Sequence, residues 1–168
     1  MLMNQNNQGP LPYVISIPKL VILSVLTFGI FDWYWFYRQW KSFAKDRHNF
    51  LVFILLAIFA VLSCFSLFPN ISGRLKDNRL KVEVSPIILA LLYFLLTGLD
   101  KLPTPFFLLS SATVIPLAFV QKEINTYSEL KYGDKLIQSN FGIRNLITSI
   151  IGGIVMFLIL YASLFLKK

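Results

Sequence analysis

The chain has 168 residues and a net charge of +8, and 56% of its residues are hydrophobic while 14% are charged. Ordinary soluble domains hold about 45–50% apolar and about 25% charged residues, so this composition argues against most soluble enzymes and indicates surface that faces lipid. The basic residues stand in short clusters beside apolar segments, which indicates membrane orientation and no nucleic-acid partner. We expect a single all-α domain over residues 1–168, a polytopic membrane bundle of four to five helices.

The first expected elements are a polar N-terminal tail, residues 1–17, and an apolar segment over residues 18–40 that Gly29 and Asp32 interrupt. The first 18 residues contain no Lys or Arg, and the apolar stretch runs into Asp-Trp-Tyr-Trp rather than a small-residue cleavage site. A cleaved signal peptide begins with positive charge and ends in a small-residue cleavage site. The segment has neither, so it is predicted to remain as a membrane anchor.

Residues 50–68 form an uncharged stretch of 19 residues in which Ser63, Cys64 and Ser66 are the only weakly polar interruptions. A helix of this length covers roughly 28 Å, which is close to the hydrocarbon thickness of about 30 Å. The stretch is therefore predicted to cross the bilayer as one helix. Cys64 has no base nearby in the sequence, so we expect it to be a packing residue.

Two further apolar segments, residues 86–99 and 102–120, are separated only by Asp100 and Lys101. So short a connection predicts an antiparallel helical hairpin. Pro116 lies within the second segment and is expected to kink it.

The last apolar segment, residues 146–166, is 21 uncharged residues closed by two lysines, as a membrane span commonly is. Ser149, Gly152 and Gly153 form a small-residue pattern there, which favours close packing against another helix of the chain, with a dimer face as the alternative. Of the polar stretches, residues 70–84 are expected at the membrane interface and residues 121–132 as an extension of the preceding helix.

Three basic clusters bear on the topology, and the positive-inside tendency favours the cytoplasm for all of them. If residues 50–68 cross the bilayer once, the first two clusters lie on opposite sides. We expect five crossings; in the alternative, with four, residues 50–68 enter the membrane and return or lie along the interface. The clusters are Arg38, Lys41, Lys45 and Arg47; Arg74, Lys76, Arg79 and Lys81; and Lys122, Lys131, Lys135 and Arg144.

The densest local pattern is a run of aromatic and basic side chains that follows Asp32. Amphipathic rings at headgroup depth with cations beyond them are typical of a membrane–water boundary, so the run is predicted to anchor the chain at the interface. The alternative is a site for a lipid tail or a cationic headgroup. The expected anchors are Trp33, Tyr34, Trp35, Tyr37, Arg38, Trp40 and Lys41.

The run over residues 19–41, KLVILSVLTFGIFDWYWFYRQWK, resembles the opening helix of small bacterial membrane proteins classed under domains of unknown function. Residues 102–105 (LPTP) and 120–125 (VQKEIN) are similar to later parts of such proteins. The resemblance implies a bacterial origin and the inner membrane. Those families have no assigned reaction, so it implies no catalytic residue.

Asp32 is the one acid embedded in an apolar or aromatic segment. A carboxylate at the bilayer centre costs about 2.5 to 3.5 kcal/mol on insertion scales. Because Arg38 follows six residues later, we expect Asp32 near the interface, solvated or paired with Arg or Lys. The alternative is a proton or ion site, which a hydroxyl or cation partner in a cavity between helices would favour.

No phosphate loop, zinc motif, nucleophile elbow or cysteine pair is present, which predicts no enzymatic activity, no metal and no cofactor. The leading hypothesis is an integral membrane protein that acts through contacts with lipids, a protein partner or a second copy of itself. The alternative is a small transporter or channel subunit, with Asp32, Ser110, Ser111 and Thr113 along its path. A lipid enzyme would require three of His48, Asp46, Asp77, Glu123 and Asp134 to converge.

Overall fold

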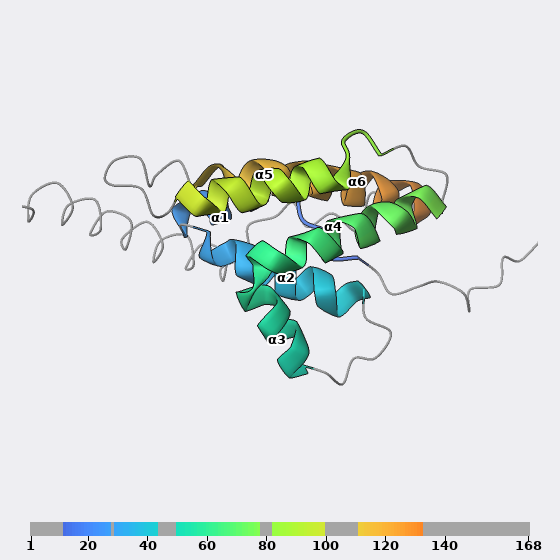
Figure 1. Cartoon of the computed structure of the whole chain (residues 1–168). Helices are drawn as coiled ribbons and strands as arrows, with labels where there is room; N and C mark the ends of the chain where they lie inside the picture. The colour runs from blue at the N-terminus through green and yellow to red at the C-terminus, as the bar shows by residue number, and fades with distance from the viewer. Residues whose placement is uncertain (1–11, 28, 44–49, 78–81, 100–110, 133–168) are drawn as a thin grey trace, which may run out of the picture.

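The computed structural model describes residues 12–27, 29–43, 50–77, 82–99 and 111–132, and in these ranges the chain forms six helices and no strand (Figure 1). The prediction of an all-α chain is confirmed for this part. Residues 146–166, with Ser149, Gly152 and Gly153, lie outside the described residues, as does His48.

The predicted segment 18–40 consists of two helices, α1 (Ile17–Leu26) and α2 (Ile30–Phe43), with a reversal between them. Gly29 has φ +78°, a conformation that residues with a Cβ rarely adopt, and its N–H donates to the Ser24 carbonyl at 2.9 Å, closing α1. The Thr27 hydroxyl accepts from the Phe31 N–H at 2.9 Å and so satisfies a free donor at the start of α2. These local bonds turn the chain back on itself.

The predicted span 50–68 is bent. Helix α3 (Phe50–Ile58) and helix α4 (Ala60–Asp77) meet at Phe59, and their axes differ in direction by 107°. Across the bend, the Ser63 hydroxyl donates to the Leu56 carbonyl at 2.8 Å, so a carbonyl that the bend leaves free is satisfied. In the described ranges no single helix has the length and hydropathy of a bilayer crossing, and the bent α3–α4 pair meets that test only as a pair.

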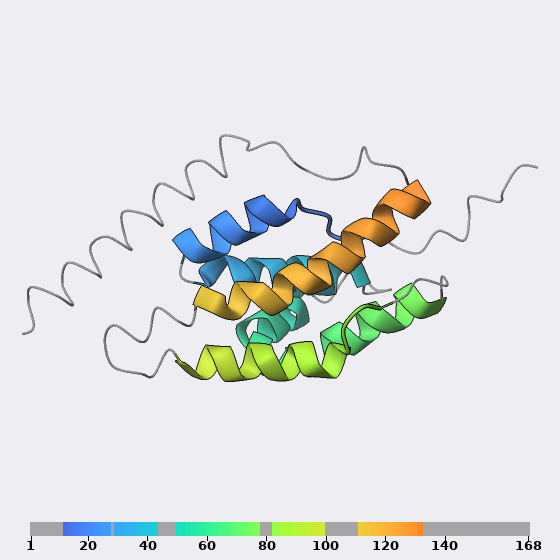
Figure 2. The same ribbon diagram turned by 90° about the horizontal axis from the view of Figure 1, so that it is seen from above.

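Helix α5 (Pro86–Gly98) coincides with the predicted segment 86–99, and proline opens it, where no N–H is needed. Helix α6 (Val114–Tyr132) lies beside α5 and runs in the opposite direction, as expected (Figures 1 and 2), but it begins at Val114, and residues 102–110 of the predicted segment 102–120 lie outside the described residues. It continues through residues 121–132, which confirms the predicted extension. Because α6 begins at Val114, Pro116 lies in its first turn and breaks no intrahelical bond, so the expected kink is absent.

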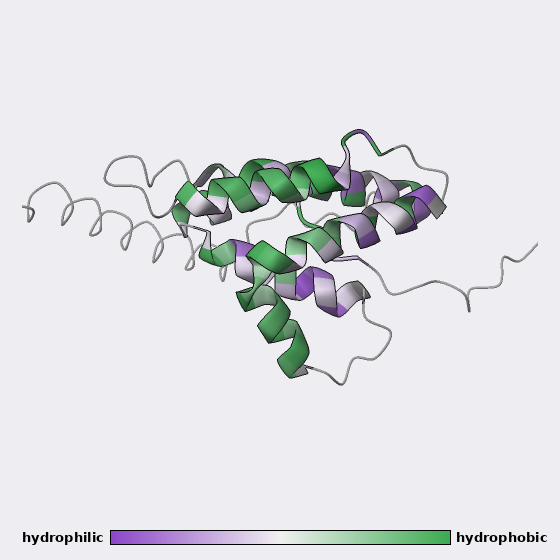
Figure 3. Ribbon diagram, in the orientation of Figure 1, coloured by the Kyte–Doolittle hydropathy of each residue, from purple (hydrophilic) through white to green (hydrophobic). Residues whose placement is uncertain are grey.

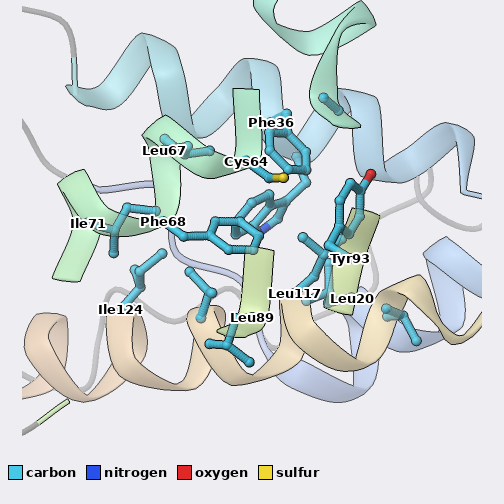
Figure 4. Packing of buried hydrophobic residues seen from close by; sticks show 14 of the residues in the cluster. Leu20, Phe36, Cys64, Leu67, Phe68, Ile71, Leu89, Tyr93, Leu117 and Ile124 are labelled. Atoms are coloured by element: carbon cyan, nitrogen blue, oxygen red, sulfur yellow. The ribbon is translucent and has the colours of Figure 1, made fainter. Parts of the chain in front are cut away.

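The core of the described residues lies where α1, α2, α4, α5 and α6 meet (Figure 4). At its centre the rings of Phe36 and Phe68 stack with centroids 5.9 Å apart, and the Tyr93 ring lies 5.3 Å from that of Phe36. Cys64 is buried beside them with its Sγ 3.6 Å from the Ala90 carbonyl, which confirms a packing role. This core holds α2 and α6 in fixed positions.

Polarity changes along the long axis of this bundle. In Figure 3 the hydrophilic residues gather at the right-hand ends of α2, α4 and α6, while α3, α5 and the beginnings of α4 and α6 are mostly hydrophobic. Residues 70–77, expected as part of a separate interfacial stretch, instead continue α4 as its polar end.

Candidate functional site

A line of buried polar side chains, here called the polar seam, runs between α2 and α6. On α2 its members stand at positions 32, 35 and 39, and on α6 at positions 121 and 125, so each set occupies one helix face. All of them are buried. The members are Ser24, Asp32, Trp35, Gln39, Thr113, Gln121 and Asn125.

Asp32 is at one end of the polar seam and is only 2% exposed. The Ser24 hydroxyl, on α1, donates to Asp32 Oδ1 at 2.6 Å, and the Thr113 hydroxyl, just before α6, donates to Asp32 Oδ2 at 3.0 Å. Among the described residues no basic side chain forms an ion pair with Asp32. The expectation of a solvated or cation-paired carboxylate is therefore wrong: the reversal at residues 27–29 folds α1 over it.

The other end of the polar seam is a cluster of amide side chains. Trp35 Nε1 donates to Gln121 Oε1 at 2.7 Å, and Gln121 Nε2 donates to Asn125 Oδ1 at 2.7 Å. Gln39 Nε2 donates to the Tyr13 carbonyl at 2.9 Å, and Asn125 Nδ2 donates to the Ile15 carbonyl at 3.0 Å. These bonds hold the extended residues 12–16 between the two helices.

One acceptor in this cluster has no partner among the described residues. Gln39 is fully buried, and its Oε1 accepts no hydrogen bond from any described residue. Ser128, one turn beyond Asn125 on α6, is fully buried too, with its Oγ likewise unpartnered among the described residues.

The predicted interface anchors divide between two faces of α2. Trp33 and Tyr34 are exposed, as an anchor requires, whereas Trp35 is fully buried, so the expectation is wrong for Trp35. Arg38 lies over the Tyr13 ring, with 4.5 Å from its guanidinium carbon to the ring centroid, and Lys41 Nζ lies 5.9 Å from the Tyr37 centroid. Trp40 is half-buried and donates to the Ser63 hydroxyl at 3.5 Å.

Several members of the polar seam were not singled out by the sequence pattern. Gln121 and Asn125 are spaced four apart, which is one helix face, and this spacing after an apolar segment is a usable signal. Thr113 was expected along a transport path and does reach Asp32. No local signal predicts that Ser24 contacts Asp32, because only the reversal at Gly29 brings the two side chains together.

The structure describes only some of the residues that the enzyme hypothesis requires. Glu123 accepts a hydrogen bond from the Glu83 N–H at 3.1 Å, and burial raises the pKa of its carboxyl. Lys122, beside it, forms an exposed ion pair with Glu83 at 2.8 Å. Among the described residues no three of the His, Cys, Asp and Glu side chains gather, while His48, Asp46 and Asp134 lie outside them.

Comparisons of the chain with protein-family models, with curated proteins and with solved structures find no match. The resemblance to small bacterial membrane proteins stays a prediction that rests on the residues quoted above.

Proposed function

We propose that the protein is a non-enzymatic integral membrane protein that acts through contacts with lipids or with a partner protein, which can be a second copy of the chain. The observation that supports this best is the apolar surface of α3 and α5. Leu51 is 72% exposed and Ile87 63%, and aliphatic neighbours on the same helices are similarly uncovered: Leu55, Ile58, Ile88, Leu91 and Leu95. Apolar patches of this kind mark a membrane or protein contact.

The location proposed is the bacterial inner membrane. The composition supports a membrane, since hydrophobic residues make up 56% of the chain. The basic clusters support a membrane with a cytoplasmic face. The resemblance over residues 19–41 supports a bacterial one.

The experiment is fractionation of bacterial cells that express the full chain with an affinity tag. We expect the protein to stay in the membrane pellet through high-salt and alkaline carbonate washes and to be released by a mild detergent. Identification of the lipids and proteins that co-purify then separates lipid contacts from a specific partner. Release by the carbonate wash would contradict membrane integration.

A second candidate is a small transporter or channel subunit that binds a proton or a monovalent cation at Asp32. The observation that favours it is the burial of the carboxylate with two hydroxyl oxygens beside it, because carboxylate and hydroxyl oxygens are ligands that hard cations prefer. In proteoliposomes the wild type would then pass protons or Na⁺, and Asp32→Asn would abolish the flux.

The matched control for that flux is Thr97→Val. Thr97 makes its hydroxyl bond to the Tyr93 carbonyl within α5, away from Asp32. Its loss should leave flux unchanged. Proteoliposomes of wild-type protein that pass neither ion would eliminate this candidate.

A further inference from the structure

Helices α1 and α2, and likewise α5 and α6, run in opposite directions, so that the end of α1 and the start of α2, like the end of α5 and the start of α6, lie at one end of the bundle, and the polar C-terminal ends of α2, α4 and α6 lie at the other (Figure 1). The end of α1, the start of α2, the end of α5 and the start of α6 lie toward the left in Figure 1, while α3 runs downward from its meeting point with α4, which lies nearer the middle. The C-terminal ends of α2, α4 and α6 lie at the right, and the view from above agrees (Figure 2). Figure 3 shows that this right-hand end is the hydrophilic one.

The lengths of α1, α3 and α5 suit insertion to half the depth of a bilayer. Helix α1 has 10 residues, α3 has 9 and α5 has 13, so they extend only about 14 to 20 Å against a hydrocarbon core of about 30 Å. None of them crosses. A pair of such helices can enter from one side, turn within the lipid and return.

The basic residues mark where each pair leaves the lipid. Along α2, Arg38 lies eight residues after the first helical residue; along α6, Lys122 is also eight residues from the start; along α4, Arg74 is fourteen residues from the start. At 1.5 Å per residue these distances are about 12 Å for Arg38 and Lys122 and about 21 Å for Arg74. One leaflet supplies about 15 Å of hydrocarbon, so Arg38 and Lys122 reach its surface and Arg74 extends beyond it.

Aromatic rings accompany the cations at this end, as headgroup depth favours. Arg38 lies over Tyr13 with 4.5 Å to the ring centroid, and Lys131 Nζ lies 5.2 Å from the Tyr127 centroid. Lys41 with Tyr37 repeats the arrangement on α2. Long basic side chains beside tyrosine rings can reach anionic headgroups while their stems stay on the apolar body.

We infer that helices α1 to α6 insert into the cytoplasmic leaflet, with α1 and α2, and likewise α5 and α6, running in opposite directions and with α3 and α4 joined by the bend at Phe59. The turns lie in the lipid, and the basic ends lie among anionic phospholipid headgroups. The inference rests on the proposed membrane location and adds the depth, side and lipid class. It also removes the conflict of charges: residues 50–68 bend by 107° at Phe59 instead of running straight through the bilayer, and under this inference the basic residues before and after them share the cytoplasmic side.

The test is single-cysteine labelling of the full chain in a Cys64→Ser background, with a membrane-impermeant maleimide on right-side-out and inverted vesicles. Three variants mark the basic end: Lys41→Cys, Lys76→Cys and Lys131→Cys. Two mark the turns: Ile30→Cys and Phe59→Cys. Ile30 is 64% exposed and Phe59 57%, so protein does not shield these two positions.

We expect the three basic-end variants to react in inverted vesicles only. The two turn variants should react from neither side until detergent is added, because lipid covers them. Reaction at positions 41 and 76 from opposite sides would restore a crossing by residues 50–68 and overturn the inference. So would labelling of position 59 in right-side-out vesicles.

Failure of the inference is distinguishable from failure of the proposed membrane location. The same vesicles are washed with carbonate before labelling. If the variants at positions 41 and 76 stay in the pellet but react from opposite sides, the result contradicts only the one-leaflet arrangement. A wild-type protein that leaves the pellet contradicts the membrane location, and the inference with it.

Discussion

Asp32 joins three parts of the chain through one carboxylate. Ser24 on α1 and Thr113 before α6 each donate to a different oxygen, and Asp32 itself belongs to α2. A buried carboxylate without a cation depends on such donors, and each charge-assisted bond contributes about 1.5–3 kcal/mol. The same residues are therefore important for the fold whether or not they bind an ion.

The Asp32–Thr113 bond predicts a coupling free energy. Thr113→Val keeps the shape of the side chain but removes the donor, and it should lower the free energy of unfolding by about 1–3 kcal/mol. Combined with Asp32→Asn, the two losses should be non-additive by at least about 0.5 kcal/mol, because Thr113→Val removes the donor of this bond and Asp32→Asn removes the charge and one of the two acceptor oxygens. Denaturant titration of the detergent-solubilised protein, followed by circular dichroism, measures both values.

Thr97→Val is the control for this cycle, since its hydroxyl bonds only within α5. The loss in free energy of unfolding from Thr97→Val should simply add to the loss from Asp32→Asn, with no coupling between them. Additivity of Thr113→Val with Asp32→Asn would mean that the bond contributes no stability.

At the scale of elements, the exposed faces decide which helix meets lipid. Helix α5 exposes one aliphatic row over most of its length, whereas the exposed side chains of α6 beyond Val120 are mostly polar. Leu95 on α5 is 58% exposed, and Leu130 near the end of α6 is 70% exposed. The two leucines therefore have similar exposure but lie at opposite ends of the polarity gradient.

Leu95→Lys should weaken membrane insertion, and Leu130→Lys should not. A lysine in the hydrocarbon costs about 2.5–3.5 kcal/mol on insertion scales, while a lysine among headgroups costs little. We expect at least a several-fold drop in the pelleted fraction for Leu95→Lys alone, measured by quantitative immunoblotting of carbonate-washed membranes. Equal retention of both variants would mean that α5 is covered by protein rather than by lipid.

At the scale of the whole molecule, the basic end implies a preference for anionic lipid. Near a membrane surface each Lys or Arg contributes about 1 kcal/mol, or roughly five-fold in affinity. Lys41 and Lys131 lie at this end with aromatic neighbours, whereas the charge of Lys122 is offset by Glu83 at 2.8 Å. The net charge of +8 gives the chain the same preference overall.

Lys41→Gln and Lys131→Gln should each reduce the ratio of phosphatidylglycerol to phosphatidylcholine that co-purifies from mixed vesicles by a few-fold. Lys122→Gln should reduce it less, and added salt should narrow all the differences because it screens the attraction. Mass spectrometry of the bound lipids measures the ratio. A ratio that none of the three variants changes would contradict headgroup contact at this end.

The sequence by itself determined that the described chain is all-helical, and it determined the location of α5 and the extension of α6 to Tyr132. Proline at the start of α5 and long uninterrupted apolar runs are local signals, and local signals are sufficient to define helices. The signs of the basic clusters were also readable. The sequence did not predict that the described members of these clusters lie at the same end of the bundle, because charge counts do not say where the chain turns.

Only the tertiary structure decided the two turns and the environment of Asp32. An apolar run such as residues 50–68 has the same composition whether it is straight or bent, and the bend depends on hydrogen bonds such as that from Ser63 to Leu56. Asp32 stands six residues from Arg38 in sequence, yet it is covered by Thr113, which is 81 residues away. Periodicity predicts which face of a helix is apolar, but burial of one carboxylate depends on which distant segment packs over it.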